Sequence, residues 1–363
     1  MRRTDALIVG GGPAGAAAAI SLARRGVSAE LIERSTGARD VVCGGFLGWD
    51  ALAALRRLGV DPSALGARPI ERLRLVAGRR VLEARLPSRA AGLSRRALDE
   101  ALLGAAVATG ARVMRGRTVR AAKEGRRVRL DDGEEIEAEA LFLATGKHEL
   151  RGLARPLQGR REEPAAGLRA ALPASPSLEE ALAGVIELHL FDGGYAGLLL
   201  QEDGWANLCL SVSRRRLSGA GGVEALIAEI VREAPLLGER IGDGAPAPWE
   251  AIAGVPYGWR ATSSEAGLFR IGDQAAVIAS LAGDGIAIAL SSGMLAADAF
   301  SHGGAAAAPA YQRGFARRSA RPVAIAERLR RAAERSGPRG AMLRLLSVLP
   351  ILVPLAARMT RIA

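Results

Sequence analysis

The feature that most constrains the fold is a glycine cluster between an apolar run and a helical pattern near the start of the chain. Residues 6–9 read ALIV, which is typical of a short strand buried on both faces. Gly10, Gly12 and Gly15 follow with the spacing G-x-G-x-x-G, and a helical pattern then continues until Gly26 ends it. The order of strand, glycine turn and helix predicts the first half of a βαβ unit.

Each glycine of this turn has a physical role. The first allows a tight turn, the second lets the backbone approach a pyrophosphate, and the third lets helix and strand pack closely. The free N–H groups at the helix start can then bind the phosphates. The next strand, SAELIE, ends at Glu33, where an acidic side chain can bind the ribose of an adenosine. The segment is therefore predicted to bind a dinucleotide, either FAD or NAD.

Length, charge and cysteine content exclude several other classes. The 363 residues are too many for one simple core, so we expect two lobes or one large α/β unit. The net charge is +12, but the basic residues are spread along the chain and only 4% of residues are aromatic, so nucleic acid is not an expected partner. Cys43 and Cys209 form no CxxC pair, and no signal peptide is recognisable, so we expect no metal and a cytoplasmic location.

A second motif, about 260 residues after the first, selects between the two dinucleotides. Residues 269–300 read as a strand, the pair Gly272-Asp273, a loop, and Gly283-Asp284-Gly285 at the start of a long helix. An aspartate at a strand end can hold the ribityl hydroxyls of a flavin. A helix N-terminus aimed at the isoalloxazine stabilises negative charge on it. We therefore expect FAD, and we expect the C-terminal part of the chain to return to the first lobe.

With both motifs in this order, residues 5–300 resemble the FAD-dependent oxidoreductases that include para-hydroxybenzoate hydroxylase-like monooxygenases and geranylgeranyl reductase-like enzymes. The resemblance implies a fold of the α/β class (α+β when the whole chain is considered). The expected parts are a Rossmann-like FAD-binding domain with the βαβ unit, a substrate domain built on an antiparallel sheet, and C-terminal helices. The implied divisions are 1–165 for the FAD-binding domain with an inserted β-meander, 166–262 for the substrate domain, 263–300 for the return to the FAD-binding domain, and 301–363 for the helices.

The resemblance also implies which residues bind FAD. Arg95 matches the arginine of the family's R-x-x-x-D helix start near the pyrophosphate, and Asp273 matches the aspartate on the ribityl chain. The expected FAD contacts are Gly10, Gly12, Pro13, Ala14, Gly15, Glu33, Arg34, Cys43, Gly44, Arg95, Val119, Gly146, Gly272, Asp273, Gly283, Gly285 and Ile286.

One departure from the family concerns the electron donor. Lys147-His148 follow Gly146 where many relatives carry an Asp-Gly pair, which in the hydroxylases touches both FAD and NADPH. This departure argues against direct use of NADPH, so two alternatives stay open for the electron donor: NAD(P)H itself and a separate electron donor.

Three residues are candidates for the chemistry. The stretch VVCGGFLGWD resembles the cysteine-glycine loop of the geranylgeranyl reductase branch, which implies that Cys43 lies near flavin and substrate; a small apolar filler is its alternative role. Residues 184–213 read as three antiparallel strands, and one face of this sheet should cover the flavin. On these strands, His189 is either an acid–base group or a solvated histidine, and Tyr195 is a candidate substrate contact.

The C-terminal tail is a basic helix followed by an apolar stretch of about a dozen residues, interrupted by Pro350 and Pro354. A membrane-spanning helix needs about 20 apolar residues. We therefore expect the tail to pack on the core, to cover a lipophilic substrate or to lie on a membrane surface.

The activity implied by the resemblance is FAD-dependent oxidation or reduction of a lipophilic small molecule of polyketide, phenol or isoprenoid type. Monooxygenase-type hydroxylation is favoured, because it is the commoner activity on this scaffold. The alternative is a geranylgeranyl reductase-like C=C reductase with Cys43 or Tyr195 as proton donor. A flavin-binding carrier or regulatory protein is the non-enzymatic alternative, and the large second domain argues against it.

Overall fold

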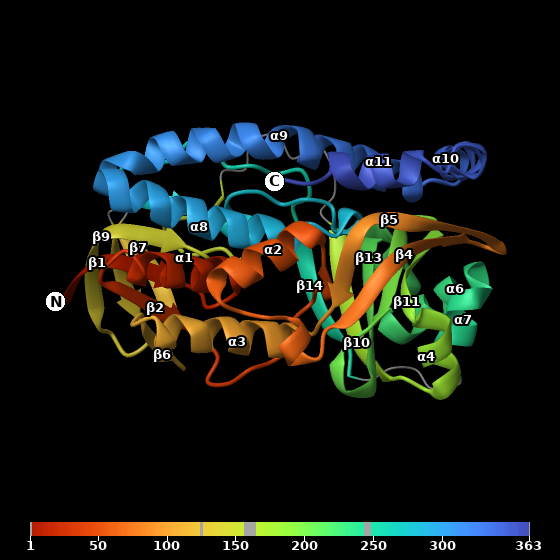
Figure 1. Ribbon diagram of the computed structural model, residues 1–363, viewed down its shortest axis with the longest axis horizontal. Helices are drawn as coiled ribbons and strands as arrows, with labels where there is room; N and C mark the ends of the chain where they lie inside the picture. Colours follow the sequence, from red (N-terminus) through yellow and green to blue (C-terminus); the bar gives the residue numbers. More distant parts are fainter. Residues whose placement is uncertain (1, 124–125, 156–164, 243–247, 363) are drawn as a thin grey trace.

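The computed structural model describes residues 2–362 except 124–125, 156–164 and 243–247. Two β-sheets lie side by side along the long axis of the molecule, and the C-terminal helices run across both of them (Figure 1). The mixed α/β architecture agrees with the predicted fold class.

The first sheet has seven strands in the order β6-β2-β1-β9-β8-β7, with β15 also paired to β9. The central strands are parallel, whereas β7 and β8 run antiparallel to their neighbours. This is the predicted Rossmann-like unit with its inserted meander. The strands are β1 (Arg2–Val9), β2 (Ala29–Glu33), β6 (Arg112–Arg115), β7 (Val119–Lys123), β8 (Arg127–Leu130), β9 (Glu135–Leu143) and β15 (Leu268–Arg270).

Helices pack closely against the first sheet. Helix α1 (Pro13–Ala23) contacts both α3 (Arg95–Ala108) and the long α8 (Gly285–Gly303). At the crossing of α1 and α8, an added Cβ on Gly293 would overlap the carbonyl oxygen of Ala14 and would lie 3.0 Å from the backbone nitrogen of Ala18. The absence of a side chain at Gly293 therefore sets how closely these two helices approach.

The second sheet has eight strands in the order β14-β10-β13-β12-β11-β4-β5-β3. Its pairs are antiparallel except β4 with β11, which are parallel. The strands are β3 (Phe46–Leu47), β4 (Arg68–Ala77), β5 (Arg80–Gly92), β10 (Ala165–Pro173), β11 (Gly184–Phe191), β12 (Gly194–Leu200), β13 (Trp205–Ser213) and β14 (Glu250–Val255).

The β4–β5 hairpin belongs to this second sheet, although the division expected from the sequence places it within 1–165. Pairing with β11 brings Leu73 and Leu75 of β4 beside Ile186 and Leu188. Those four side chains join one apolar cluster, and the cluster would be incomplete if the hairpin stayed on the first sheet. The second sheet is thus assembled from two separate parts of the chain.

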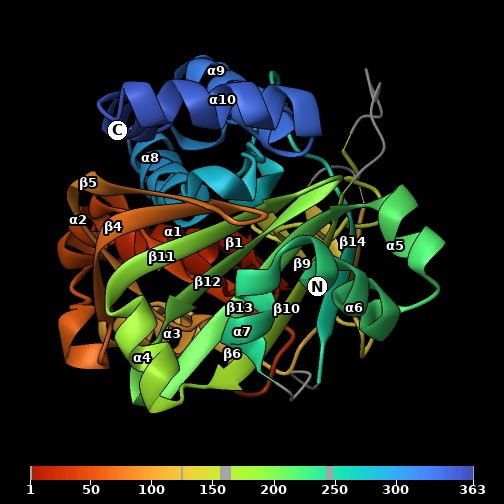
Figure 2. The ribbon, with the colours of Figure 1, turned by 90° about the vertical axis from the view of Figure 1, so that its right-hand side faces the viewer.

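The remaining helices cover the two faces of the second sheet. Its outer face packs against α4 (Pro176–Leu182), α5 (Arg214–Ala220), α6 (Val223–Glu233) and α7 (Pro235–Ile241). Helix α10 (Ser336–Val348) and the C-terminal end of α9 (Ala308–Ala333) lie over the opposite face (Figure 2), whereas the rest of α9 packs against α8 and β15. The other helical segments are α2 (Trp49–Leu58), α11 (Leu352–Met359) and the 3₁₀ turns Ser63–Leu65, Glu202–Gly204, Gly272–Gln274, Ser280–Ala282 and Gly304–Ala307.

Among the described residues, no single helix has both the length and the apolar character needed to cross a membrane. Helices α10 and α11 meet those criteria only when taken together, and they are bent by 117° at the break between them.

Candidate functional site

A cavity of about 1160 Å³ lies where the two sheets meet. We call the part lined by the first sheet and its loops the cofactor arm; it includes Gly10–Ala14, Glu33 and Arg95. The part lined by the second sheet and the C-terminal helices is called the apolar arm; it includes Leu75, Leu188 and Met342. The volume of the whole cavity is somewhat above the range of about 300 to 1,000 Å³ that is usual for small-molecule sites.

The glycine turn is built to approach a phosphate. Gly10 has φ +109°, a conformation that glycine adopts without strain. Helix α1 begins after Gly12, and no side chain caps its first turn, so its N–H groups are free to bind a ligand. Gly15 is not among the cavity-lining residues; an added Cβ would overlap the carbonyl oxygen of Gly10. Gly15 therefore supports the site through close helix–strand packing.

Glu33 is held at the end of β2 by two backbone hydrogen bonds. The Gly11 N–H donates to Oε2 at 2.7 Å and the Ser35 N–H donates to Oε1 at 2.8 Å. Glu33 lines the cavity, and each carboxylate oxygen can accept a further hydrogen bond, which suits the two hydroxyls of a ribose. Glu33 thus lies where the sequence predicts a ribose ligand.

Arg95 lies beside the glycine turn. Its guanidinium pairs with both carboxylate oxygens of Asp99, at 2.9 and 2.7 Å. An added Cβ on Gly12 would lie 3.3 Å from Arg95 Nη2, so the cation is adjacent to the predicted pyrophosphate position. The other expected FAD contacts also line this cavity: Pro13, Ala14, Arg34, Cys43, Gly44, Val119, Gly146, Gly272, Asp273, Gly283, Gly285 and Ile286.

The start of α8 offers a second free helix N-terminus. Asp284 is the N-cap residue, but its side chain makes no capping hydrogen bond. Instead, it pairs with Arg361 at 2.7 Å, and Arg361 also stacks on the Trp49 ring at 4.2 Å. Burial raises the pKa of Asp284 to about 8. The first-turn N–H groups of α8 are thus left available, as a flavin ring requires.

The residues present therefore fit FAD along the whole cofactor arm. Two uncapped helix starts, a glycine turn and an acidic ribose acceptor occur in the order that the dinucleotide needs. The binding role of each of these residues stays a prediction.

Between the two arms lies the junction, which we define by Cys43, Lys147, Tyr195, Tyr257 and Ser280. All five residues line the cavity. The Ser280 hydroxyl is 2.5 Å from the Tyr195 hydroxyl and 2.8 Å from the Tyr257 hydroxyl, and the Leu281 N–H donates to Tyr195 at 3.0 Å. Burial raises the pKa of Tyr195 well above its ordinary value, so this phenol keeps its proton at neutral pH.

A cation and a thiol complete the junction. Lys147 Nζ donates to the Val42 carbonyl at 3.5 Å, and the Gly45 N–H donates to Cys43 Sγ at 3.5 Å. Burial opposes the charge on Lys147, but Asp273 and other nearby groups outweigh it and raise the pKa of this ammonium. Burial also raises the pKa of Cys209, on the adjoining strand β13, to about 12.

The apolar arm follows one row of residues across the second sheet. Leu75, Leu188, Gly197 and Cys209 are paired from strand to strand, and all four line the cavity. Gly197 has no side chain, which leaves space in the middle of the row. The opposite wall comes from α9, α10 and α11, with Leu329, Met342, Leu346, Leu352 and Val353. The lining also includes Leu345 and Leu355, which are about half exposed, so the arm reaches the surface there.

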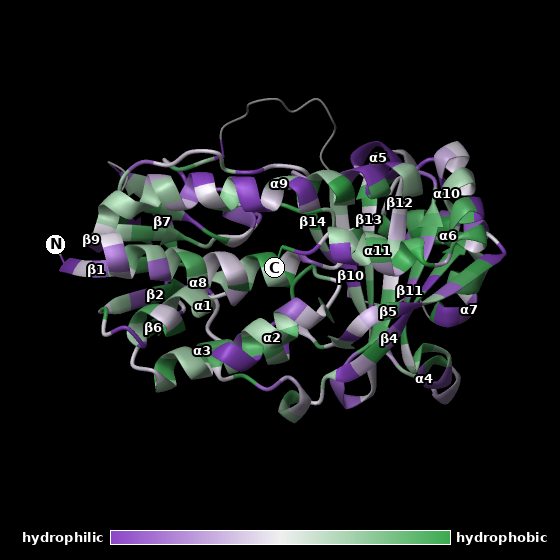
Figure 3. Ribbon diagram, turned by 45° about the horizontal axis from the view of Figure 1, so that its top comes forward, coloured by the Kyte–Doolittle hydropathy of each residue, from purple (hydrophilic) through white to green (hydrophobic). Residues whose placement is uncertain are grey.

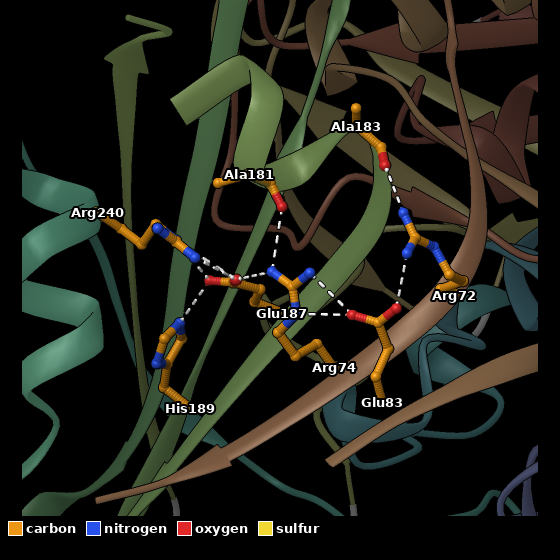
Figure 4. Close-up of polar contacts among 8 residues, drawn as sticks. All are labelled: Arg72, Arg74, Glu83, Ala181, Ala183, Glu187, His189 and Arg240. Atoms are coloured by element: carbon orange, nitrogen blue, oxygen red, sulfur yellow. Dashed lines mark hydrogen bonds and ion pairs between the residues drawn. The ribbon is translucent and has the colours of Figure 1, made fainter. Parts of the chain in front are cut away.

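The prediction of His189 as an acid–base group at the flavin is wrong. Strand alternation turns Ile186, Leu188 and Leu190 toward the cavity, and His189 faces the other side of the sheet, where it is fully buried. Figure 4 shows its Nε2 toward Glu187, at 3.1 Å. Because α7 covers this face, the alternative of a solvated histidine is also wrong.

Glu187 is the centre of this buried cluster. It pairs with Arg74 at 2.5 Å and with Arg240 at 3.1 Å (Figure 4). Burial would raise its pKa, but the hydrogen bonds from His189, Arg240 and Arg74 lower it to about 2. The cluster ties α7 to strands β4 and β11 and has a structural role.

Sequence reasoning missed Tyr257, Ser280 and Arg361, and it did not treat Lys147 as a functional side chain. Tyr257, Ser280 and Arg361 come from irregular segments whose neighbours depend on the tertiary fold. Lys147 did carry a signal, since the chain holds only two lysines and otherwise uses arginine as its basic residue.

Comparison with known proteins agrees with this geometry. A family model described as FAD binding domain matches residues 3–152. The menaquinone reductase of Mycobacterium tuberculosis is 31% identical over 314 residues, which cover 81% of this chain and 76% of that protein. The structure of a geranylgeranyl bacteriochlorophyll reductase-like protein from Thermoplasma acidophilum aligns with a TM-score of 0.77 at 18% identity. The alignment covers 94% of this chain and 90% of that protein's chain.

The structure of PqsL of Pseudomonas aeruginosa, described as a probable FAD-dependent monooxygenase, aligns with a TM-score of 0.72 at 17% identity. The alignment covers 94% of this chain and 100% of the PqsL chain. The two structural likenesses show the fold, and the M. tuberculosis protein matches across most of both sequences. The chain therefore belongs to the family of FAD-dependent oxidoreductases that includes the mycobacterial menaquinone reductases.

Proposed function

We propose that this oxidoreductase hydroxylates an oxygen-bearing ring, such as a phenol, that carries a long apolar chain. The observation that carries the proposal is the continuous cavity, in which hydrogen-bond donors surround the junction and apolar side chains line the arm beyond it. In this arrangement the ring lies at the junction beside the flavin, and its chain lies in the apolar arm.

FAD, when bound, supplies the redox chemistry. The residues of the chain bind and orient the substrate. The Lys147 ammonium and the Tyr195 hydroxyl can both donate to an oxygen on the ring, which favours the phenolate over the phenol. A phenolate ring is richer in electrons and is more readily hydroxylated. The leucine side chains of the apolar arm exclude water from the junction.

The experiment supplies the FAD-loaded enzyme with reductant, oxygen and either a long-chain alkylphenol or the same phenol without its chain. We expect the long-chain phenol to gain one oxygen atom by mass spectrometry. Gly197→Leu narrows the arm without a backbone clash, because the nearest atom to an added Cβ is a flexible Leu188 carbon at 3.4 Å. We expect this variant to raise KM for the long-chain phenol and to leave KM for the chainless phenol unchanged.

A second candidate reaction is reduction of a C=C bond or of a quinone ring. It is favoured by the name of the M. tuberculosis relative and by Tyr195, whose raised pKa makes it a proton donor and not a base. The same mass measurement separates the two reactions when a quinone with an unsaturated apolar chain is supplied beside the phenol, because reduction adds two hydrogen atoms to the quinone ring or to the C=C bond and no oxygen.

We propose a separate electron donor in place of direct reduction by NAD(P)H. The support is the pair Lys147-His148, which stands where many relatives carry the Asp-Gly pair that touches NADPH. Mixing the FAD-loaded enzyme with NADPH under anaerobic conditions should leave the flavin oxidised on the timescale of turnover. Rapid bleaching would make NADPH the donor.

The C-terminal helices are proposed to rest on an anionic membrane surface. Val348 and Ile351 are 76% and 70% exposed, and helix α11 is coloured mainly as hydrophobic in Figure 3. The exposed Arg344 and Arg358 flank these apolar residues and complement anionic headgroups. Since the apolar arm reaches the surface at the same place, a membrane-dissolved substrate could enter directly.

Vesicle sedimentation tests this contact. We expect the enzyme to sediment with vesicles that contain phosphatidylglycerol and to stay in solution with pure phosphatidylcholine. The double variant Val348→Ser, Ile351→Ser should lose binding, and sedimentation that is unaffected by these substitutions would contradict the proposed surface.

A further inference from the structure

Lys147 lies at the boundary between the cofactor arm and the apolar arm. Its side chain lines the cavity, with Asp273 of the cofactor arm among the charged groups that act on it. Tyr257 and Cys209, on the side of the apolar arm, also raise the pKa of its ammonium. The reacting ring of a bound flavin must lie at this boundary, because the cavity continues from the ribose and ribityl positions into the substrate space.

The ammonium of Lys147 is not in contact with a carboxylate of the described residues. In the described part of the chain, no carboxylate lies within 4.0 Å of Nζ, and its one hydrogen bond is the long contact to the Val42 carbonyl at 3.5 Å. Asp273 stabilises the charge without an ion-pair contact, so the donor positions of the ammonium are left largely unused. A negative charge delivered by a ligand at the junction can occupy those positions.

We infer that Lys147 is the counterion of the reduced flavin ring. Two electrons and one proton convert neutral oxidised FAD into a reduced ring that carries one negative charge, and the ammonium favours this anion over the oxidised form. The inference depends on FAD binding and not on the reaction proposed above, because it concerns the cofactor before any substrate is present.

The expected effect is on the flavin equilibrium. Removing one nearby charge from a partly buried site should shift the ratio of reduced to oxidised flavin by roughly ten- to a hundredfold. For a two-electron couple, a tenfold change corresponds to 29.6 mV, so the midpoint potential should fall by about 30 to 60 mV.

The test uses FAD-loaded enzyme without substrate, in which the midpoint potential is measured by equilibration with a redox dye. Lys147→Met keeps the length of the side chain and removes its charge, whereas Lys147→Arg keeps the charge. Lys123→Met is the matched control, because Lys123 is the other lysine and pairs with Glu135 at 3.1 Å on the surface. We expect the potential to fall in the Lys147→Met variant and to stay near the wild-type value in the other two.

Binding of oxidised FAD is measured for the same variants. The inference predicts that Lys147→Met changes this affinity by less than about threefold, because the ammonium acts on the anion. An unchanged potential in Lys147→Met overturns the inference. The inference is also overturned if Lys147→Met weakens the binding of oxidised and reduced FAD equally, because the ammonium would then stabilise both forms of the cofactor alike. A normal potential combined with a weaker affinity for phenolate would assign the ammonium to the substrate.

Discussion

Replacing Gly293 with alanine tests the helix contact on which the phosphate-binding end of α1 depends. The added methyl group would meet the backbone of Ala14 and Ala18, and backbone atoms cannot rotate away as a side chain can. Helices α1 and α8 must therefore move apart. Ala14 lines the cofactor arm, so the movement also displaces part of the predicted pyrophosphate site.

The size of the effect follows from two opposing contributions. Overpacking in a close-packed core costs about 1 to 3 kcal/mol. The clash at Gly293 is with backbone atoms, which places its cost in the upper part of this range, at about 2 to 3 kcal/mol. Alanine returns about 1 kcal/mol through its better helix propensity, so we expect a net loss of about 1 to 2 kcal/mol in the free energy of unfolding. Gly104 in α3 provides the matched control, since an added Cβ there meets nothing within 4 Å. Gly104→Ala should therefore stabilise the protein by up to about 1 kcal/mol.

Urea denaturation of the FAD-free protein measures both variants, because bound FAD would add its own stabilisation to the folded state. Titration with FAD then gives the affinity, which we expect to fall by roughly threefold or more in Gly293→Ala, since each 1.4 kcal/mol is a factor of ten. The reasoning is refuted if Gly293→Ala is as stable as the wild type, or if both glycine variants change stability in the same direction.

Three further predictions concern single side chains. The pKa of Asp284 is about 8 in the folded protein and 3.8 in the unfolded chain, so the unfolded chain releases this proton first and the free energy of unfolding falls as the pH rises from 3.8 toward about 8. Asp284→Asn should remove this pH-dependent loss, and urea midpoints at the two ends of the pH range check it. His189→Gln should lower the free energy of unfolding by about 1 to 3 kcal/mol and leave FAD content and turnover unchanged, whereas lost turnover at normal stability would restore a catalytic role. Tyr195→Phe removes one donor from the junction and should lower kcat by roughly tenfold or more without changing FAD affinity; an unchanged kcat would remove Tyr195 from the reaction.

The parts of the site that follow from local rules could be predicted from the sequence. Gly10, Gly12 and Glu33 lie where the βαβ pattern places them, because the turn, the helix start and the strand end are set by residues close together in the chain. Asp273, just after the end of β15, also lines the cavity as expected, and its contact with the ribityl chain stays a prediction.

The parts that depend on long-range packing could not be predicted. Alternation along β11 shows that His189 and Leu188 face opposite sides, but the packing of α7 on one face and α10 on the other decides which side is the cavity. The sheet that accepts the β4–β5 hairpin is likewise decided by a pairing between segments more than one hundred residues apart. The role of Arg361 depends on the C-terminal tail returning to Asp284 at the start of α8.

The open far end of the apolar arm has a consequence for substrate length. An arm closed at its end would reject chains above a fixed length, and its preference would fall on both sides of an optimum. Here the lining reaches the surface at Leu345 and Leu355, so a longer chain can extend past the protein. In a homologous series we therefore expect kcat/KM to rise with each added carbon until the arm is filled and then to stay constant. The enzyme would select the ring and a minimum chain length, with no upper limit on the chain.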